Sequence, residues 1–465
     1  MSNWLPELSA RSGPLYRAIV EVLEADIAAG RLPAGTRLPT QRDLAWRLKV
    51  TVGTVARAYA EAERRGLVSG EVGRGTYVKA PGSDDLPAIA HFLPPELSGR
   101  GGLINMALNR PSNDQGASAI APVLEALARR PDLPQILSYN LEPAWPRHRA
   151  AAARWLAWEG VDADPDDILI GVGSQQCLIG ALAATTHPGD AVLVEDFTYP
   201  GIRSAVSLLG RHLVPVATDD GGLIPDEVER AFADHKGRVL YTIATVQNPL
   251  NVTLSEARRR AIAESARRHD AFVIEDGIHR FLHPAAPPSI RAFAPERVLY
   301  ITAMAKSVSP GLRAGFMATP PRLRGRAEAA VGATTLTLAT LLVEVAAVLI
   351  EEGTAFAMAE AQRNECAARV DIAVGILGER VRPPTASLNI WLPLEPPWRS
   401  AAFVAEAGRR GVAVSPTESF AVGRPCRDGV RLSISAPVSR EEVGRGVAIL
   451  ADILSVSPQQ VGMTV

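Results

Sequence analysis

The sequence has few cysteines and no apolar run of membrane-spanning length. Its three cysteines, Cys177, Cys366 and Cys426, are far apart and odd in number, so they indicate neither a disulfide framework nor a metal site. The first residues, MSNWLPELSARSG, lack the apolar core of a signal peptide. The most apolar window, residues 334–350, is shorter than a membrane span and contains Glu344. These absences predict a protein of the cytoplasm, a reducing environment.

The composition is that of a globular protein with more than one domain. The chain has 465 residues, which is too long for one core and fits about two to three domains. Its formal net charge of −1 hides an asymmetry, because residues 1–79 hold 12 Lys and Arg against 8 Asp and Glu, a net charge of +4. A basic first segment before a remainder of net charge −5 indicates that only the first segment meets nucleic acid.

The basic first segment contains three helical patterns and a predicted wing. The first pattern begins at Pro14 and places apolar residues four apart on one face. Thr40 is placed to cap a second helix over residues 41–48, and Thr51 to cap a third. Residues 67–78 then carry apolar residues on both sides of a Gly-Arg-Gly turn, which predicts two short strands.

Two short helices across a tight turn are the geometry of a helix-turn-helix, whose second helix enters the major groove of DNA by its N-terminal end. The exposed residues predicted at that end are Thr51, Thr54 and Arg57, two short donors and one long cation. Arg74, at the tip of the wing, is placed to reach the minor groove. The alternative is a small helical dimerisation or ligand-binding domain with a solvated basic face, which helical periodicity does not exclude.

Residues 15–78 resemble the winged helix-turn-helix domain of the GntR family of bacterial repressors. The resemblance is dense over LPTQRDLAWRLKVTVGTVARAYAEAERRGLVSGEVGRGTYV. It implies a DNA-binding domain over residues 1–79. The positions that this family uses against phosphates and bases hold Arg37, Thr40, Arg42, Thr51, Thr54, Arg57 and Arg74.

Residues 80–102 predict a linker. The segment APGSDDLPAIAHFLPPELSGRGG clusters proline, glycine, serine and acidic residues without periodicity. Its four prolines make it semi-extended rather than fully flexible. A linker of this length allows the DNA-binding domain to lie away from its own body or to pack on a neighbouring subunit.

From about residue 164 the chain alternates short strand-like runs with helical stretches. This alternation predicts a largely parallel sheet with helices on both faces. The predicted strands are residues 168–172, 191–195, 238–244, 271–275 and 298–301.

Each predicted strand leads into a turn with a distinctive side chain, and such turns meet at the sheet edge where open α/β folds bind ligands. In chain order the turns supply a helix start at Ser174, an aromatic ring at Tyr199, an amide at Asn248, a carboxylate at Asp276, and Lys306 followed by Arg313. Taken alone, each has a structural alternative: a helix cap, a packed tyrosine, a turn residue, a surface lysine. Together they suit a pyridine ring that carries a phosphate, an aldehyde and a ring nitrogen.

Residues 103–465 resemble the fold-type I aminotransferases, which bind pyridoxal 5′-phosphate. The resemblance implies an α/β domain with a smaller C-terminal α/β subdomain, and a homodimer with sites at the subunit interface. It makes Lys306 the Schiff-base lysine, Asp276 the partner of the ring nitrogen, and Arg431 the arginine that holds a substrate carboxylate. The other contacts that it implies are a phosphate cup at Ser174 and Gln175, a stacking ring at Tyr199, a ring-hydroxyl contact at Asn248 and a phosphate contact at Arg313. Tyr139 is a looser match to a residue that reaches the phosphate in a neighbouring subunit.

A GntR-type domain in front of such a body is the architecture of the MocR subfamily of transcriptional regulators. Resemblance to this subfamily implies a regulator that binds operator DNA and senses an amine, an amino acid or the cofactor itself by imine exchange at Lys306. Two alternatives stay open. One is an active aminotransferase with a regulatory or vestigial DNA-binding head, and the other is a cofactor-free dimerisation module.

Two positions depart from the aminotransferase pattern. Active relatives carry a tyrosine two or three residues after the aspartate, where this chain has Ile278 and His279, and a hydroxyl three residues before the lysine, where it has Ala303. The missing hydroxyl removes one phosphate contact, worth about 1.5–3 kcal/mol. We therefore expect cofactor binding to survive and transamination to be impaired. We expect His279 to be a solvated loop residue, the alternative being a donor in place of the tyrosine.

Overall fold

The computed structural model describes residues 4–6, 15–28, 31–32, 36–64, 67–71, 75–78, 103–112, 115–140, 144–235, 239–423 and 427–456. The chain divides into two compact units, residues 1–88 and 89–465. The predicted linker, residues 80–102, and the wing-tip Arg74 lie outside the described residues. Within the described ranges, no helix has the length and apolar character needed to cross a membrane.

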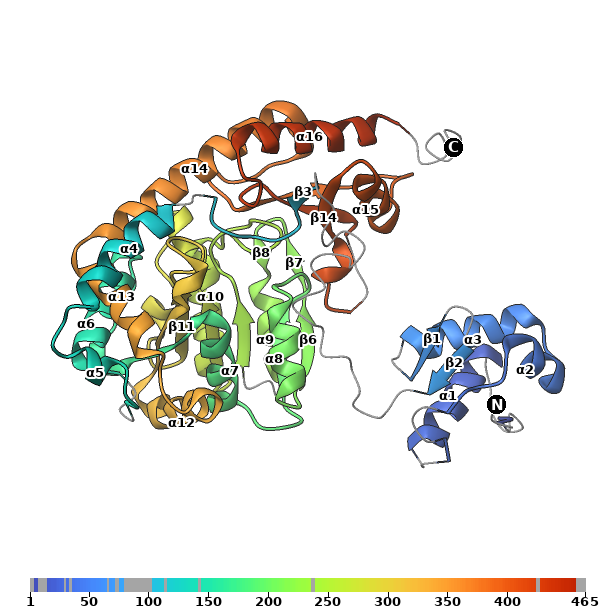
Figure 1. The fold of residues 1–465 in the computed structure, drawn as a ribbon. Helices are drawn as coiled ribbons and strands as arrows, with labels where there is room; N and C mark the ends of the chain where they lie inside the picture. The colour runs from blue at the N-terminus through green and yellow to red at the C-terminus, as the bar shows by residue number, and fades with distance from the viewer. Residues whose placement is uncertain are drawn as a thin grey trace. The chain divides into compact units, whose positions relative to one another are not determined.

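The first unit is a three-helix domain with a two-stranded sheet, drawn in blue in Figure 1. Its elements are α1 (Leu15–Ala28), α2 (Gln41–Leu48), α3 (Val52–Arg64), β1 (Val68–Glu71) and β2 (Gly75–Val78), with the two strands antiparallel. Thr40 Oγ1 accepts a hydrogen bond from the Asp43 N–H at 3.3 Å, and Thr51 Oγ1 accepts one from the Thr54 N–H at 3.2 Å. These two caps begin α2 and α3 where the sequence predicts, and the strands of the wing are confirmed as well.

A small apolar core fixes the helices of this domain. Ile19 and Leu23 of α1, Leu44 of α2 and Val55 of α3 are fully buried together. The hydroxyl of Tyr59 in α3 donates to the carbonyl oxygen of Pro39, just before α2, at 2.8 Å. The crossing of α2 and α3 is therefore set by packing and by one buried hydrogen bond.

The second unit is built on a seven-stranded sheet with the order β4-β12-β11-β10-β9-β5-β6. The strands are β4 (Ile168–Val172), β5 (Ala191–Glu195), β6 (His212–Val216), β9 (Val239–Thr242), β10 (Phe272–Asp276), β11 (Val298–Ala303) and β12 (Ala314–Ala318). β12 is antiparallel to β11 and β4, and the other neighbouring strands are parallel. The carboxyl ends of β4, β5, β9, β10 and β11 therefore lie at one edge of the sheet, where β12 begins.

Helices cover both faces of this sheet, so its strands are buried on both sides. One face packs against α7 (Gly173–Thr185), α8 (Gly201–Leu208) and α12 (Arg324–Thr335). The other face packs against α6 (Pro146–Trp158), α9 (Pro225–His235), α10 (Glu256–Arg268), α11 (Ile290–Phe293) and α13 (Thr340–Glu351). The remaining elements of this part are α4 (Gln115–Leu127), α5 (Leu133–Ile136), and the short strands β7 (Thr218–Asp219) and β8 (Gly222–Leu223).

A four-stranded sheet forms the smaller subdomain, in the order β13-β15-β14-β3. Its strands are β3 (Ile104–Met106), β13 (Asn389–Pro393), β14 (Val412–Pro416) and β15 (Gly429–Ser433). The helices α14 (Thr354–Leu377), α15 (Ser400–Arg409) and α16 (Arg440–Ser455) pack against it. Because β3 pairs in parallel with β14, the segment that follows the predicted linker is part of this C-terminal sheet.

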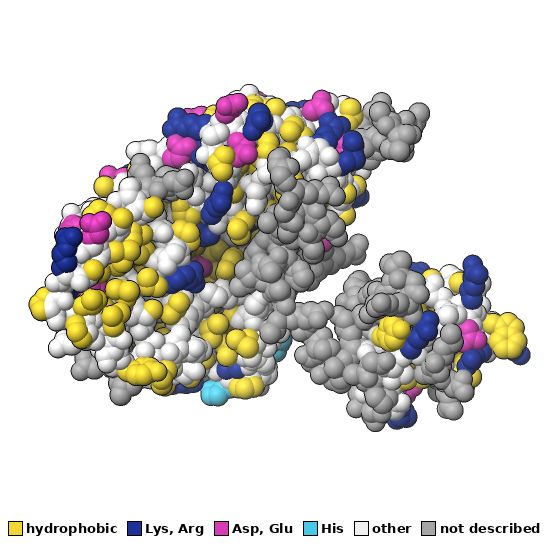
Figure 2. Space-filling view, in the orientation of Figure 1, with side chains coloured by type: hydrophobic (Ala, Val, Ile, Leu, Met, Phe, Trp, Pro, Cys, Tyr) yellow, Lys and Arg dark blue, Asp and Glu magenta, His cyan; other side chains and the backbone are white. Residues whose placement is uncertain are grey.

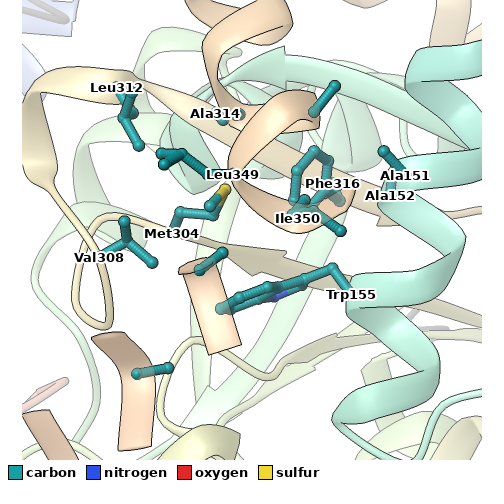
Figure 3. Packing of buried hydrophobic residues seen from close by; sticks show 14 of the residues in the cluster. Ala151, Ala152, Trp155, Met304, Val308, Leu312, Ala314, Phe316, Leu349 and Ile350 are labelled. Atoms are coloured by element: carbon teal, nitrogen blue, oxygen red, sulfur yellow. The ribbon is translucent and has the colours of Figure 1, made fainter. Parts of the chain in front are cut away.

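An apolar cluster holds the loop between β11 and β12. Met304 and Val308 are buried in one cluster with Trp155 of α6 and Ile350 of α13 (Figure 3). Met304 and Val308 lie two residues before and two residues after Lys306. Close packing on both sides therefore fixes the backbone that carries this lysine.

Candidate functional site

The side chains at the strand ends surround one cavity of about 160 Å³. Six residues that the sequence predicts for the site line it: Ser174, Tyr199, Asn248, Asp276, Lys306 and Arg431. The rest of the lining comes from Leu108, Asn109, Ile243, Ile278 and His279. Most of these residues meet because five strands end at the same edge of the large sheet, while Arg431, Leu108 and Asn109 reach the cavity from the smaller sheet.

Lys306 faces the segment that follows β3. Its Nζ donates a hydrogen bond to the backbone carbonyl oxygen of Asn109 at 2.5 Å. Burial, and then the positive charges of Arg431 and Arg313, lower the pKa of the Lys306 ammonium to about 8. The side chain therefore has a larger neutral fraction near neutral pH than an exposed lysine, and the neutral amine is the form that attacks a carbonyl carbon.

Asp276, at the end of β10, is a buried carboxylate whose hydrogen-bond donors among the described residues are neutral. Its Oδ2 accepts a hydrogen bond from the Tyr241 hydroxyl at 2.8 Å, and its Oδ1 accepts one from the Ile278 N–H at 3.1 Å. Burial raises the pKa of Asp276. The neighbouring Glu275 has a cationic partner, because Arg259 Nη1 lies 3.6 Å from its Oε1. Of the two strand-end carboxylates, Asp276 is thus the one that faces the cavity.

The turn from β4 into α7 leaves a helix N-terminus open beside Arg313. No side chain caps α7 at Val172, and Gly173 has φ +78°. Arg313 Nη2 donates to the Val172 carbonyl oxygen at 3.1 Å, and a Cβ added to Gly173 would lie 2.5 Å from that nitrogen. The positive φ favours glycine at this position, and a larger side chain there would displace the guanidinium of Arg313.

Gln175 positions Tyr199 instead of lining the cavity. Its Nε2 donates to the Gly201 carbonyl oxygen at 2.9 Å, and its Oε1 accepts from the Tyr199 hydroxyl at 3.2 Å. Both ends of the amide are thus occupied by the chain itself. Burial raises the pKa of Tyr199 to about 12, so its hydroxyl stays protonated and acts as the donor in this pair.

Arg431, on β15, is a buried cation with no carboxylate partner among the described residues. Its side chain is 3% exposed and donates to three neutral oxygens: Asn248 Oδ1 at 3.0 Å, Ser415 Oγ at 3.4 Å and the carbonyl oxygen of Ala107. Its Nε has no hydrogen-bond partner in the described structure. Burial lowers the pKa of Arg431 to about 9. A buried guanidinium of this kind is left with charge that an anion in the cavity can balance.

His279 is not the solvated residue that the sequence suggested. It is 3% exposed, lines the cavity, and its Nδ1 lies 2.8 Å from the Val246 carbonyl oxygen. The prediction failed because residues 277–282, which follow β10, are all buried instead of forming an exposed loop. The available signal was that His279 lies only three residues after Asp276, which places the imidazole near the edge of the sheet where β10 ends.

Sequence reasoning also missed Leu108, Asn109 and Tyr241. The first two follow β3 in the smaller sheet, and the third supports Asp276 from the neighbouring strand β9. Of these three, only Tyr241 could have been found from the sequence, because its hydroxyl lies within a predicted buried strand and needs a hydrogen-bond partner. Lys306 and Asn109 are 197 residues apart in the chain, so no local pattern links them.

In the first unit, the residues predicted to contact DNA lie on and around α2 and α3. Thr40, Arg42, Thr51 and Arg57 are exposed, while Thr54 is half-buried and shares a hydrogen bond with Thr51 between their Oγ1 atoms at 2.9 Å. Arg37 forms an isolated bridge with Tyr77 of the wing, and Arg74 lies outside the described residues. Trp46 of α2, which sequence reasoning missed, is 80% exposed.

The geometry agrees with comparisons to known proteins. The family model described as aminotransferase class I and II matches residues 102–450. The chain belongs to this family. A second model, described as bacterial regulatory proteins of the gntR family, matches residues 15–78. The order of the two domains is that of MocR-type proteins.

Relatives of this MocR-type chain include regulators and aminotransferases. It is 29% identical over 456 residues to an uncharacterized HTH-type transcriptional regulator of Bacillus subtilis, YdeF, with 97% of each chain covered. It is 29% identical over 334 residues to the probable rhizopine catabolism regulatory protein MocR of Rhizobium meliloti, covering 67% of this chain and 66% of that one. The structure of kynurenine aminotransferase from Pyrococcus horikoshii, in complex with PMP, matches with a TM-score of 0.69 at 25% identity, covering 80% of this chain and 99% of that one.

Proposed function

We propose that this MocR-type chain is a transcriptional regulator that binds DNA through residues 1–79, holds pyridoxal 5′-phosphate at Lys306, and responds to an amine or amino acid in the same cavity. The observation that carries the proposal is that a partly buried lysine and a buried arginine line the same cavity. Lys306 has a lowered pKa, and Arg431 lacks a carboxylate partner among the described residues. A gntR-type domain precedes this cavity in the chain.

The residues around the cavity fit the cofactor. The open N-terminus of α7, which has 13 residues, and the guanidinium of Arg313 lie together and suit a phosphate. The buried carboxylate of Asp276 has neutral donors in the described part of the chain and suits a protonated ring nitrogen. Tyr199, held by Gln175, supplies an aromatic face, and Asn248 supplies an amide at the cavity wall.

When bound, the cofactor supplies an aldehyde that joins amines covalently and a ring that withdraws electrons from them. The chain binds and orients it. Lys306 provides the amine for covalent attachment, Asp276 keeps the ring nitrogen protonated, and Arg313 with α7 neutralises the phosphate. Ile243 and Ile278 give the cavity apolar walls that exclude water.

Arg431 gives the cavity a preference for ligands that carry a carboxylate. A planar guanidinium binds a carboxylate with two parallel hydrogen bonds, which fixes the orientation of the ligand. Its present acceptors are neutral oxygens, and a charged acceptor forms stronger hydrogen bonds than these do. The effector class that fits is an amine with a carboxylate, an amino acid.

The same segment of backbone, residues 103–112, accepts hydrogen bonds from both cationic side chains. Lys306 donates to the carbonyl oxygen of Asn109, and Arg431 donates to that of Ala107. A ligand amine that displaces Lys306, or a carboxylate that engages Arg431, competes with these hydrogen bonds. Residues 103–112 follow the predicted linker directly in the sequence, and we propose that they couple the cavity to the DNA-binding domain. The link is allosteric if it gives a measurable coupling free energy between effector and DNA.

The proposal includes a homodimer. Figure 2 shows apolar side chains gathered on the face of the second unit formed by α4, α5 and α12. Leu124, Leu137, Tyr139 and Leu336 are exposed there, and Tyr139 is 79% exposed. Apolar exposure of this kind is typical of an interface between subunits. Two DNA-binding domains in a twofold dimer would contact two half-sites of an operator.

Arg57→Ala is expected to weaken binding to the DNA beside the protein's own gene. The Arg57 guanidinium lies 4.2 Å from the ring centroid of Tyr16, and this stacking restricts its side chain on the helix expected in the major groove. If Arg57 contacts a base, its loss costs about 1–3 kcal/mol of binding free energy. If it contacts a phosphate, its loss lowers the slope of log binding constant against log salt concentration by about one. Fluorescence anisotropy over a series of salt concentrations measures both.

Arg31→Ala is the matched control, because it removes the same charge from the same unit. Arg31 pairs with Asp26 after α1 rather than lying on α3. Equal losses of DNA affinity in the two variants would mean that only the overall charge of the domain determines binding. Unchanged affinity in Arg57→Ala would show that α3 is not the reading helix.

One experiment tests the proposed function as a whole. The purified full-length chain is incubated with pyridoxal phosphate, reduced with borohydride and digested, and mass spectrometry locates the pyridoxyl group, which we expect on Lys306. The same preparation is tested for binding to DNA beside its gene, and for turnover of amino acids with a keto acid. An unlabelled chain would overturn the cofactor assignment, and steady turnover without DNA binding would favour an aminotransferase.

A further inference from the structure

We propose that His279 and Asn248 together recognise a neutral hydroxyl group in the cavity, with His279 Nε2 accepting a hydrogen bond from it and Asn248 Nδ2 donating one to it. The inference rests on the proposed function, because the hydroxyl in question is the phenol of the pyridoxal ring. It predicts that this chain holds that phenol protonated, whereas a tyrosine at this position donates a hydrogen bond and favours the phenolate.

The tautomer of His279 is fixed by its backbone partner. Nδ1 lies 2.8 Å from the Val246 carbonyl oxygen, which can only accept, so Nδ1 carries the proton. A neutral imidazole then has a lone pair on Nε2. The ring is neutral because it is buried close to two positive charges, Lys306 and Arg431, and these factors lower the pKa of His279 to about 4. Nε2 has no hydrogen-bond partner within the described structure, and the residue lines the cavity.

The amide of Asn248 is oriented in the same way. Arg431 Nη1 can only donate, and it lies 3.0 Å from Asn248 Oδ1, so that oxygen is the acceptor. The Nδ2 group is therefore the end of the amide that remains for a ligand. Asn248 and His279 both line the cavity, and each is fixed in orientation by a second group of the chain.

One donor and one acceptor that line the same cavity match a hydroxyl, which accepts one hydrogen bond and donates another. A phenolate oxygen would meet the lone pair of Nε2 with its own negative charge, which is repulsive. A phenol turns this contact into a hydrogen bond. The sequence replaces the donor of active aminotransferases with an acceptor, and so reverses the preferred protonation state of the ligand oxygen.

Absorption spectroscopy of the holo-protein tests this inference separately from cofactor attachment. Borohydride reduction and mass spectrometry first establish whether the pyridoxyl group is on Lys306, whatever the state of the phenol. In the untreated protein at neutral pH, we expect a dominant near-ultraviolet band, the signature of a protonated phenol. Excitation of this band should give strongly red-shifted emission, because the phenol proton transfers in the excited state. A labelled Lys306 with a dominant visible band would overturn the inference while leaving the proposed function intact.

His279→Tyr should shift the spectrum toward the visible band, lowering the ratio of near-ultraviolet to visible absorbance about tenfold, the effect of one hydrogen bond to a charged oxygen. His187→Tyr is the matched control, because His187 is 75% exposed and does not line the cavity. A folded His279→Tyr protein that keeps the near-ultraviolet band would also overturn the inference. Should that variant fail to fold, the spectrum and emission of the unaltered protein decide.

Discussion

A Lys306→Ala protein will carry no pyridoxyl group after incubation with pyridoxal phosphate and borohydride, while the unaltered chain will be labelled at Lys306. No other lysine lines the cavity in the described part of the chain. Lys306 also has the lowered pKa, to about 8, that a nucleophilic amine requires near neutral pH. The expected effect is therefore a complete loss of covalent attachment, measured by mass spectrometry of the reduced and digested protein.

Lys49→Ala provides the control for this experiment. Lys49 is exposed at the end of α2, so any label on it reports unspecific modification of surface amines. The control protein should be labelled on Lys306 like the unaltered chain. Retention in Lys306→Ala of a pyridoxyl group at a residue other than the exposed Lys49 would show that the cofactor is held elsewhere.

Arg431→Lys is expected to weaken the binding of an amino-acid effector by about ten- to a hundredfold. The substitution keeps the positive charge and removes the planar fork that binds a carboxylate through two hydrogen bonds. A hydrogen bond to a charged group is worth about 1.5–3 kcal/mol, which corresponds to this loss in affinity. The measurement is a titration of the cofactor absorbance with the amino acid that binds most tightly in a screen.

The amine formed by decarboxylation of that amino acid is the control ligand. This amine lacks the carboxylate that Arg431 is proposed to bind. It should therefore bind the unaltered protein and Arg431→Lys with nearly the same affinity. A loss of equal size for both ligands would mean that the substitution disturbs Asn248 and Ala107, the present partners of Arg431, rather than a carboxylate contact. Unchanged affinity of Arg431→Lys for the amino acid would show that Arg431 does not bind the effector.

Much of the fold follows from the sequence because buried strands leave a clear pattern. β4 and β5 begin and end where their apolar runs predict, since each is buried on both faces and bounded by turn residues. β6 was missed, because an edge strand is partly exposed and this one contains Pro215. β12 was missed too, and its antiparallel direction depends on where the chain re-enters the sheet and not on the residues of the strand.

The cavity was predictable where its residues follow strands and unpredictable where they do not. The strand-end rule brought Tyr199, Asn248 and Asp276 together from turns far apart in the chain. The same rule says nothing about Asn109, which reaches the cavity from the smaller sheet. The strand-end rule also does not predict the direction of a side chain. Gln175 points toward Tyr199 and accepts a hydrogen bond from its hydroxyl. The tautomer of His279 depends on a carbonyl 33 residues away in the sequence, so only the folded chain defines it.

The affinity of the full-length protein for the DNA beside its gene, measured with and without pyridoxal phosphate and the bound amino acid, tests the central claim most directly. We expect the ligands to change this affinity by about five- to 150-fold, the usual range of allosteric coupling, in the unaltered chain. In Lys306→Ala the ligands should leave the affinity unchanged. Equal DNA affinity with and without ligands in the unaltered chain, at concentrations that fill the cavity, would contradict the account.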